Sequence, residues 1–125
     1  MRRDAYDGGV IVGLDHVQVA APPGGEDEAR RFYGGTLGLE EIAKPPLLAA
    51  RGGVWFRAGA HELHVGVEQE FAPARKAHPA FAVVDLEALA ARIGDVAWPD
   101  PAEIPGVRRF HCHDPFGNRL EFVEA

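Results

Sequence analysis

Short stretches in which apolar and polar residues alternate recur along the chain and predict β-strands. The first runs over residues 14–20, where Val17 and Val19 fall on one face and His16 and Gln18 fall on the other. The same reading predicts strands at 41–44, 54–57, 62–68, 79–84, 96–98, 107–113 and 119–124. The chain is therefore expected to consist largely of short strands with one apolar face.

Two stretches instead have the spacing of an amphipathic helix. The stretch 26–38 has acidic residues in its first turn and apolar residues at helical spacing after it, and Gly38 supplies the stop. The stretch 85–94 opens with Asp85 and closes at Gly94. A helix is thus predicted after the first strand and another after the strand at 79–84.

These elements repeat in one order, strand, helix and three strands. LDHVQVA corresponds in position to AHPAFAV, and ELHVGVE corresponds to RLEFVE. The repeat predicts an α+β fold of tandem βαβββ modules that form a cupped mixed sheet. We expect one domain over 13–125, with modules at about 13–70 and 71–125, after an N-terminal tail at 1–12.

Composition excludes several classes of function. The net charge of −6 and the absence of a basic patch argue against nucleic-acid binding. No apolar run approaches the roughly 20 residues of a membrane span, and the start lacks a run of signal-peptide length. The single cysteine, Cys112, is expected to be a buried spectator thiol in a cytoplasmic protein.

Candidate chemistry lies on the strand faces opposite the bulky apolar residues. His16, His64, His78 and Glu121 all occupy such faces, interleaved with Gln, Gly and Ala rather than with Lys, Thr and Ser. This composition suits a lined cleft, and imidazole and carboxylate groups are ligands for divalent transition metals. The alternative is that they are ordinary polar residues on amphipathic strands.

Four segments, LDHVQVA, ARRFYGGTLGLEE, HPAFAVVDLEAL and HDPFGNRLEFVE, resemble the vicinal oxygen chelate superfamily. This superfamily includes glyoxalase I, fosfomycin-resistance enzymes, extradiol dioxygenases and bleomycin resistance proteins. The resemblance covers about residues 13–125 and is strongest in the closing DPFGNRLEFVE. It implies paired βαβββ modules around a divalent metal.

The resemblance also implies roles for individual residues. Glyoxalase-like members would take their metal ligands from His16, His64, His78 and Glu121, and members with three ligands would omit His64. Glu121 and His64 are then candidates for proton transfer during catalysis. Further residues that could contact substrate are His111, Trp55, Gln18 and Glu62, although a polar strand edge for His111 and core packing for Trp55 are alternatives.

The implied activity is that of a glyoxalase-like lyase or isomerase. Such an enzyme would use zinc, nickel, manganese or iron(II) to stabilise an enolate or alkoxide of a small molecule with vicinal oxygens. The alternatives are an extradiol ring-cleaving dioxygenase and a non-catalytic binder of an antibiotic or another small molecule. An anionic substrate such as a glutathione conjugate would need basic contacts, for which Arg57, Arg109 and Arg119 are the obvious candidates. A homodimer is expected because many members pair.

Overall fold

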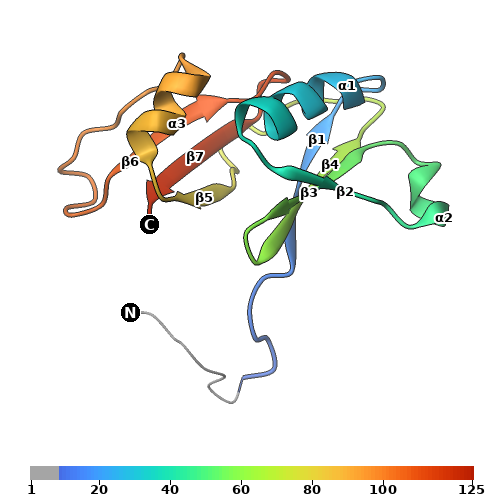
Figure 1. Ribbon diagram of the computed structural model, residues 1–125, viewed down its shortest axis with the longest axis horizontal. Coiled ribbons are helices and arrows are strands. Elements are labelled where there is room, and N and C mark those ends of the chain that lie inside the picture. The colour runs from blue at the N-terminus through green and yellow to red at the C-terminus, as the bar shows by residue number, and fades with distance from the viewer. Residues whose placement is uncertain (1–8) are drawn as a thin grey trace.

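A computed structural model describes residues 9–125, so residues 1–8 of the predicted tail lie outside the described part (Figure 1). The first half contains β1 (His16–Ala21), α1 (Glu26–Ala29), the π-helical segment η1 (Arg30–Thr36), β2 (Glu40–Ile42), α2 (Pro46–Ala49), β3 (Val54–Ala58) and β4 (His61–Val67). The second half contains β5 (Ala80–Val83), α3 (Leu86–Ile93), β6 (Arg109–His113) and β7 (Arg119–Glu124). The observed strands closely follow the predicted ones.

The strands form two mixed sheets with related topology. The first sheet has the order β1-β4-β3-β2 and the second has the order β5-β7-β6. In each sheet the first strand of the half pairs in parallel with the last strand, and the last two strands of the half pair antiparallel. This repeated arrangement confirms the predicted α+β fold of tandem modules.

One strand of the second half is reduced to a single bridge. Ala97 exchanges backbone hydrogen bonds with His111 at 2.8 and 2.9 Å, and no strand forms over 96–98. Pro99 follows immediately, and proline cannot donate a hydrogen bond to a ladder and restricts the residue before it. The second sheet therefore has three strands, whereas the first has four.

The predicted helix at 26–38 divides into two conformations. Four residues are α-helical, and η1 then follows, with the Leu37 amide donating to the carbonyl of Phe32 at 2.8 Å. Gly34 and Gly35 lie in this segment, and glycine weakens an α-helix. A Cβ at Gly34 would lie 3.5 Å from Phe56, so the helix packs closely on β3. The short α2, which has Pro46 at its start, was not predicted.

One apolar core joins the two halves. Alternate residues of the strands are buried beneath α1, η1 and α3, which lie on one side of the sheets in Figure 1, whereas α2 projects at the edge of the first sheet. The largest fully buried side chains are Tyr33, Phe56, Phe110, Phe122, Leu63, Leu86, Leu120, Val54 and Val65. Cys112 also lies in this core, and burial raises the pKa of its thiol to about 11.

The turn between β6 and β7 attaches the second half to the first. Asp114 accepts a hydrogen bond from the Tyr33 hydroxyl at 2.6 Å and, through its other oxygen, from the amides of Phe116 and Asn118 at 2.9 and 2.8 Å. The Asn118 side chain donates to the carbonyl of Ala20 in β1 at 2.7 Å. The polar residues of DPFGN thus have a structural use, because they fix the β6–β7 hairpin against the first half.

No helix within residues 9–125 is long and apolar enough to cross a membrane.

Candidate metal centre

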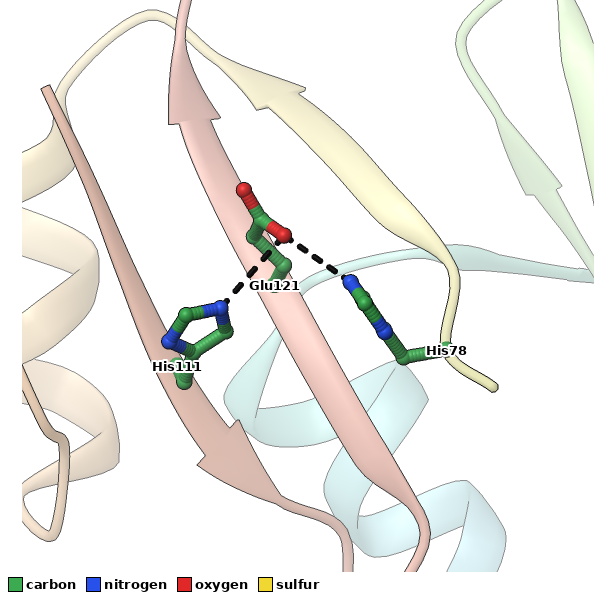
Figure 2. A group of neighbouring side chains, drawn as sticks. All are labelled: His78, His111 and Glu121. Carbon is green, nitrogen blue, oxygen red and sulfur yellow. Dashed lines mark hydrogen bonds and ion pairs between the residues drawn. The ribbon is translucent and has the colours of Figure 1, made fainter. Parts of the chain in front are cut away.

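Three side chains of the kinds that ligate metal ions converge on the face of the second sheet that is opposite the core (Figure 2). His78 immediately precedes β5, His111 is central in β6, and Glu121 lies in β7. One nitrogen or oxygen of each lies within 4.8 Å of the others, and this is the one such group of three among residues 9–125. His78 Nε2 is 2.9 Å and His111 Nε2 is 3.4 Å from the same oxygen, Glu121 Oε1.

Strand register explains why these three residues meet. In the antiparallel β6–β7 hairpin His111 pairs directly with Glu121, and in the parallel β5–β7 pair Glu121 is opposite Ala80. The Glu121 amide donates to the carbonyl of Pro79 at 3.1 Å, which holds the chain next to His78 against β7. Leu120 and Phe122 are buried on the other face, so Glu121 must point away from the core.

The hydrogen bonds of His78 orient its ring toward the carboxylate. His78 Nδ1 is 2.9 Å from the carbonyl oxygen of Lys76, to which it can only donate. The ring therefore presents Nε2 to the group, which is the arrangement typical of a histidine that ligates a metal through one nitrogen.

The protonation states of the group suit a cation. Desolvation raises the pKa of Glu121, but its hydrogen bonds with His78 and Arg109 outweigh it, so the pKa of this carboxyl is lowered. Desolvation lowers the pKa of His111, against the opposing charge of Glu121. Metal binding requires an ionised carboxylate and a neutral imidazole, which are the states favoured for Glu121 and His111. As a set of donors, two imidazoles and one carboxylate suit a divalent transition metal.

Two arginines border the group. Arg109 Nη1 lies 3.3 Å from Glu121 Oε2 and 3.4 Å from His111 Nε2, and Arg109 Nη2 donates to Glu103 at 2.7 Å. Arg119 Nη2 lies 3.5 Å from the same His111 nitrogen. The group is therefore bounded by positive charge.

The candidates of the first half form a separate cluster on the first sheet. The Trp55 and His64 rings stack with centroids 3.9 Å apart and an interplanar angle of 2°, and His16 stacks on His64 at 4.2 Å and 17°. Glu62 Oε1 lies 2.9 Å from His64 Nε2. His64 is 5% exposed, so the stack buries it on the face that is opposite the core.

Gln18 also belongs to this face of the first sheet. It is opposite His64 in the parallel β1–β4 register. A Cβ at Gly66 would lie 2.7 Å from the Gln18 amide nitrogen, so the glycine makes room for this side chain. Trp55, Gln18 and Glu62 thus surround His64, and none of them belongs to the group of three on the second sheet.

The structure divides the predicted residues between the two sheets. His78 and Glu121 are together, as expected, and His111, which was predicted to contact substrate, completes their group. His16 and His64 are together in the stack and are not part of that group. Sequence reasoning did not assign His111 as a possible ligand or foresee that Arg109 and Arg119 converge on it. The available signal was the hairpin, since His111 and Glu121 lie on either side of one tight turn.

Comparison with known proteins places the chain among solved structures. It is similar to a protein from Bacillus anthracis assigned to the glyoxalase family, with 52% identity, a TM-score of 0.88, and 93% of this chain and 97% of that chain covered. No family model and no curated protein sequence matches.

More distant similarity concerns the fold alone. Lactoylglutathione lyase from Agrobacterium tumefaciens has 22% identity and a TM-score of 0.68, with 94% and 96% of the two chains covered. The fosfomycin resistance protein FosX from Mesorhizobium loti has 18% identity and a TM-score of 0.66, with 92% and 93% covered. These structures share the architecture in which the three side chains meet.

Proposed function

Because this chain belongs to the glyoxalase family of the vicinal oxygen chelate superfamily, we propose that it is a divalent-metal-dependent lyase or isomerase acting on a small molecule with two neighbouring oxygens. The observation that carries the proposal is the convergence of His78, His111 and Glu121 on an open sheet face. Zinc, nickel, manganese and iron(II) all accept this set of donors.

The protein residues have distinct parts in this proposal. A metal held by the three side chains would supply a Lewis acid for the substrate oxygens. Glu121 would serve both as a ligand and as the base that removes a substrate proton, because its carboxylate is ionised and Arg109 orients it through Oε2. The contact of His78 Nε2 with Oε1 is given up when that nitrogen holds a metal. Proton transfer by such a positioned carboxylate typically contributes about 10²–10⁴-fold to a rate.

We further propose that the residues of the first sheet complete the cleft and that the working form is a homodimer. His16 is the candidate for a further ligand, because its side chain is 44% exposed, whereas His64 is held between Trp55 and His16. His64, Trp55, Gln18 and Glu62 would then form the wall that faces substrate. Two forms of this site differ in the source of His16. In one form His16 comes from the same chain as the group of three, and in the other it comes from a second copy.

Exposed apolar residues support the dimer. The segment before β1 extends away from the sheets in Figure 1 and carries Val10, Ile11, Val12 and Leu14, which are 73–96% exposed. A run of this kind is typical of a surface that packs against a partner. Sedimentation equilibrium of the protein and of an Ile11→Ser variant tests this: a dimer that the substitution weakens is expected, and a monomer at all concentrations would contradict it.

One observation favours a second candidate function, a ring-cleaving dioxygenase. Two histidines and one carboxylate form the donor set of non-haem iron(II) oxygenases that leave positions open for substrate and oxygen. Iron in the purified protein and oxygen consumption with catechol would favour it. Zinc, nickel or manganese with no oxygen consumption would favour the lyase or isomerase.

Metal binding is the first test of the proposal. Metal content by mass spectrometry and nickel titration by calorimetry should give close to one ion per chain, and His78→Ala, His111→Ala and Glu121→Gln should each weaken binding at least tenfold. Matched controls are His113→Ala, an exposed histidine on the same strand as His111, and Glu124→Gln, on the same strand as Glu121. The controls should bind as the unmodified protein does.

The opposite result has a defined meaning. If the reconstituted protein binds no divalent metal while circular dichroism shows it folded, the metal-dependent proposal is wrong. The same cleft would then be that of a non-catalytic small-molecule binder, which would be pursued by ligand screening.

A further inference from the structure

We propose that the substrate is a carboxylate with a neighbouring hydroxyl or carbonyl oxygen, and that Arg119, with Arg109, holds the carboxylate beside the metal group. This inference rests on the proposed function and specifies the class of its substrate. Four observations on the second sheet carry it: the shared face of the two arginines, their convergence on one atom, their different ion pairing, and the charge balance around the group.

The two arginines occupy the same face as the metal group, on opposite sides of it. In the β6–β7 hairpin, the His111–Glu121 pair is central. Arg109 lies two residues before His111 on β6, and Arg119 lies two residues before Glu121 on β7. Since the strands are antiparallel and side chains alternate, these positions lie on the same face and flank the central pair at either end.

Both guanidinium groups then turn inward. Arg109 Nη1 and Arg119 Nη2 lie 3.4 and 3.5 Å from one atom, His111 Nε2. Two cations repel each other, so their convergence on one imidazole nitrogen indicates a place where an anion is favoured. A carboxylate that bridges the two groups would replace this repulsion with charge-assisted hydrogen bonds.

The two arginines differ in how far they are already paired. Arg109 is mostly buried, with 12% of its side chain exposed, and is bound to Glu103 and Glu121. Among residues 9–125, no carboxylate lies within ion-pair distance of Arg119. Arg119 is therefore available to bind an incoming anion. Arg109 instead fixes the positions of Glu121 and Glu103.

The charge balance selects an anion over a neutral ligand. The two guanidinium groups balance the carboxylates of Glu103 and Glu121, and a divalent cation would add two positive charges in a partly desolvated place. A neutral diol or ketone would leave this charge uncompensated. A carboxylate with an adjacent oxygen matches both features, since the guanidinium fork suits a planar carboxylate and the two oxygens suit the metal.

The test uses two small molecules of similar size, one anionic and one neutral. Glycolate has a carboxylate beside a hydroxyl, and glycolamide is its neutral counterpart. Each is titrated into the zinc-loaded full-length protein, and binding is followed by amide shifts in ¹H–¹⁵N spectra. Glycolate should bind at least tenfold more tightly than glycolamide. Arg119→Met should reduce this preference severalfold, leaving the part that zinc itself contributes, while glycolamide binding stays the same. Arg119→Lys should reduce it less.

A matched control separates local from general charge effects. Arg57 is an exposed arginine on the first sheet, where its Nε lies 3.8 Å from Glu40 Oε1. Because it is not on the sheet that carries the metal group, Arg57→Met should leave the preference for glycolate unchanged. A preference that depends on Arg57 and not on Arg119 would overturn the assignment. Equal binding of the two probes, or full retention of the preference in Arg119→Met, would overturn it also.

Failure of this inference can be told from failure of the proposed function. Zinc affinity is measured on the same samples, and Arg119→Met should leave it within about threefold, because Arg119 is not in the donor set. Zinc binding without a preference for glycolate overturns the anion inference alone. If zinc does not bind at all, the proposed function is wrong. Titration of glycolate into the metal-free protein and Arg119→Met then decides whether the arginines bind an anion by themselves.

Discussion

The buried carboxylate of Asp114 illustrates how one residue supports the site without touching it. Its oxygens accept hydrogen bonds from Tyr33, Phe116 and Asn118, and the turn that they fix sets the β6–β7 register. His111 and Glu121 face each other only in that register. The residue that anchors the turn therefore determines whether two members of the metal group can meet.

Asp114→Ala should lower the free energy of unfolding by about 3 kcal/mol, because it leaves several buried donors without an acceptor. Tyr33→Phe, which removes one donor, should cost about 1 kcal/mol. Denaturant unfolding measures both. Asp95→Ala, at an exposed aspartate, serves as the control and should change stability by less than about 0.5 kcal/mol. An Asp114→Ala variant as stable as the control would show that the network does not hold the turn.

At the scale of elements, the junction of α1 with the start of β3 depends on a glycine. Gly53 has φ of +91°, and its amide donates to Glu26 Oε2 at 2.9 Å. A Cβ at this position would lie 2.4 Å from the carbonyl oxygen of Val65 in β4. Both the backbone conformation and the close approach of β4 therefore require glycine here.

Gly53→Ala should destabilise the protein by more than about 2 kcal/mol, because the φ penalty and the clash with backbone add. Gly59→Ala is the matched control. Gly59 also has positive φ, +62°, but a Cβ there meets nothing within 4 Å. Its cost should be about 1 kcal/mol. Thermal melts of the two variants side by side would contradict the explanation if they showed equal losses.

The same junction predicts a pH dependence. The hydrogen bond from the Gly53 amide is the main cause that lowers the pKa of Glu26 below its usual value near 4.5. A lowered pKa in the folded state means that the contact stabilises above the ordinary pKa and is lost as the pH falls through the folded-state pKa. Glu26→Gln should thus cost roughly 1 kcal/mol at pH 7 and progressively less below about pH 4.5. A difference that is constant from pH 7 to pH 3 would contradict it.

At the scale of the whole molecule, a ligand that binds only the folded chain should raise its stability. Nickel or zinc at about 100 times its dissociation constant should add about 2.7 kcal/mol and raise Tm by several degrees. His78→Ala should lose at least about half of this shift, because binding at least tenfold weaker leaves no more than about 1.4 kcal/mol of it. The exposed His113→Ala should keep the full shift. A full shift in His78→Ala would place the metal elsewhere.

The sequence by itself determined which way each strand faces. Alternation assigned Leu63 and Val65 to the core, and Leu120 and Phe122 likewise, and all four are buried. It therefore also assigned Glu121 to the opposite face. This succeeds because alternation is a local property of an extended chain, in which burial of one residue dictates the direction of the next. The repeat of the pattern likewise predicted the tandem modules that the sheets confirm.

Only the tertiary structure decided which outward-facing residues meet. His16 and His64 join Trp55 in a stack on the first sheet, whereas His78 and Glu121 join His111 on the second. Face assignment is local, but neighbourhood depends on register and on pairing between strands distant in sequence, such as β5 with β7. The hairpin turn sets His111 opposite Glu121, and the parallel pairing of β5 brings His78 to them. The sequence thus determined the chemistry of the open face, and long-range strand pairing determined the constellation on it.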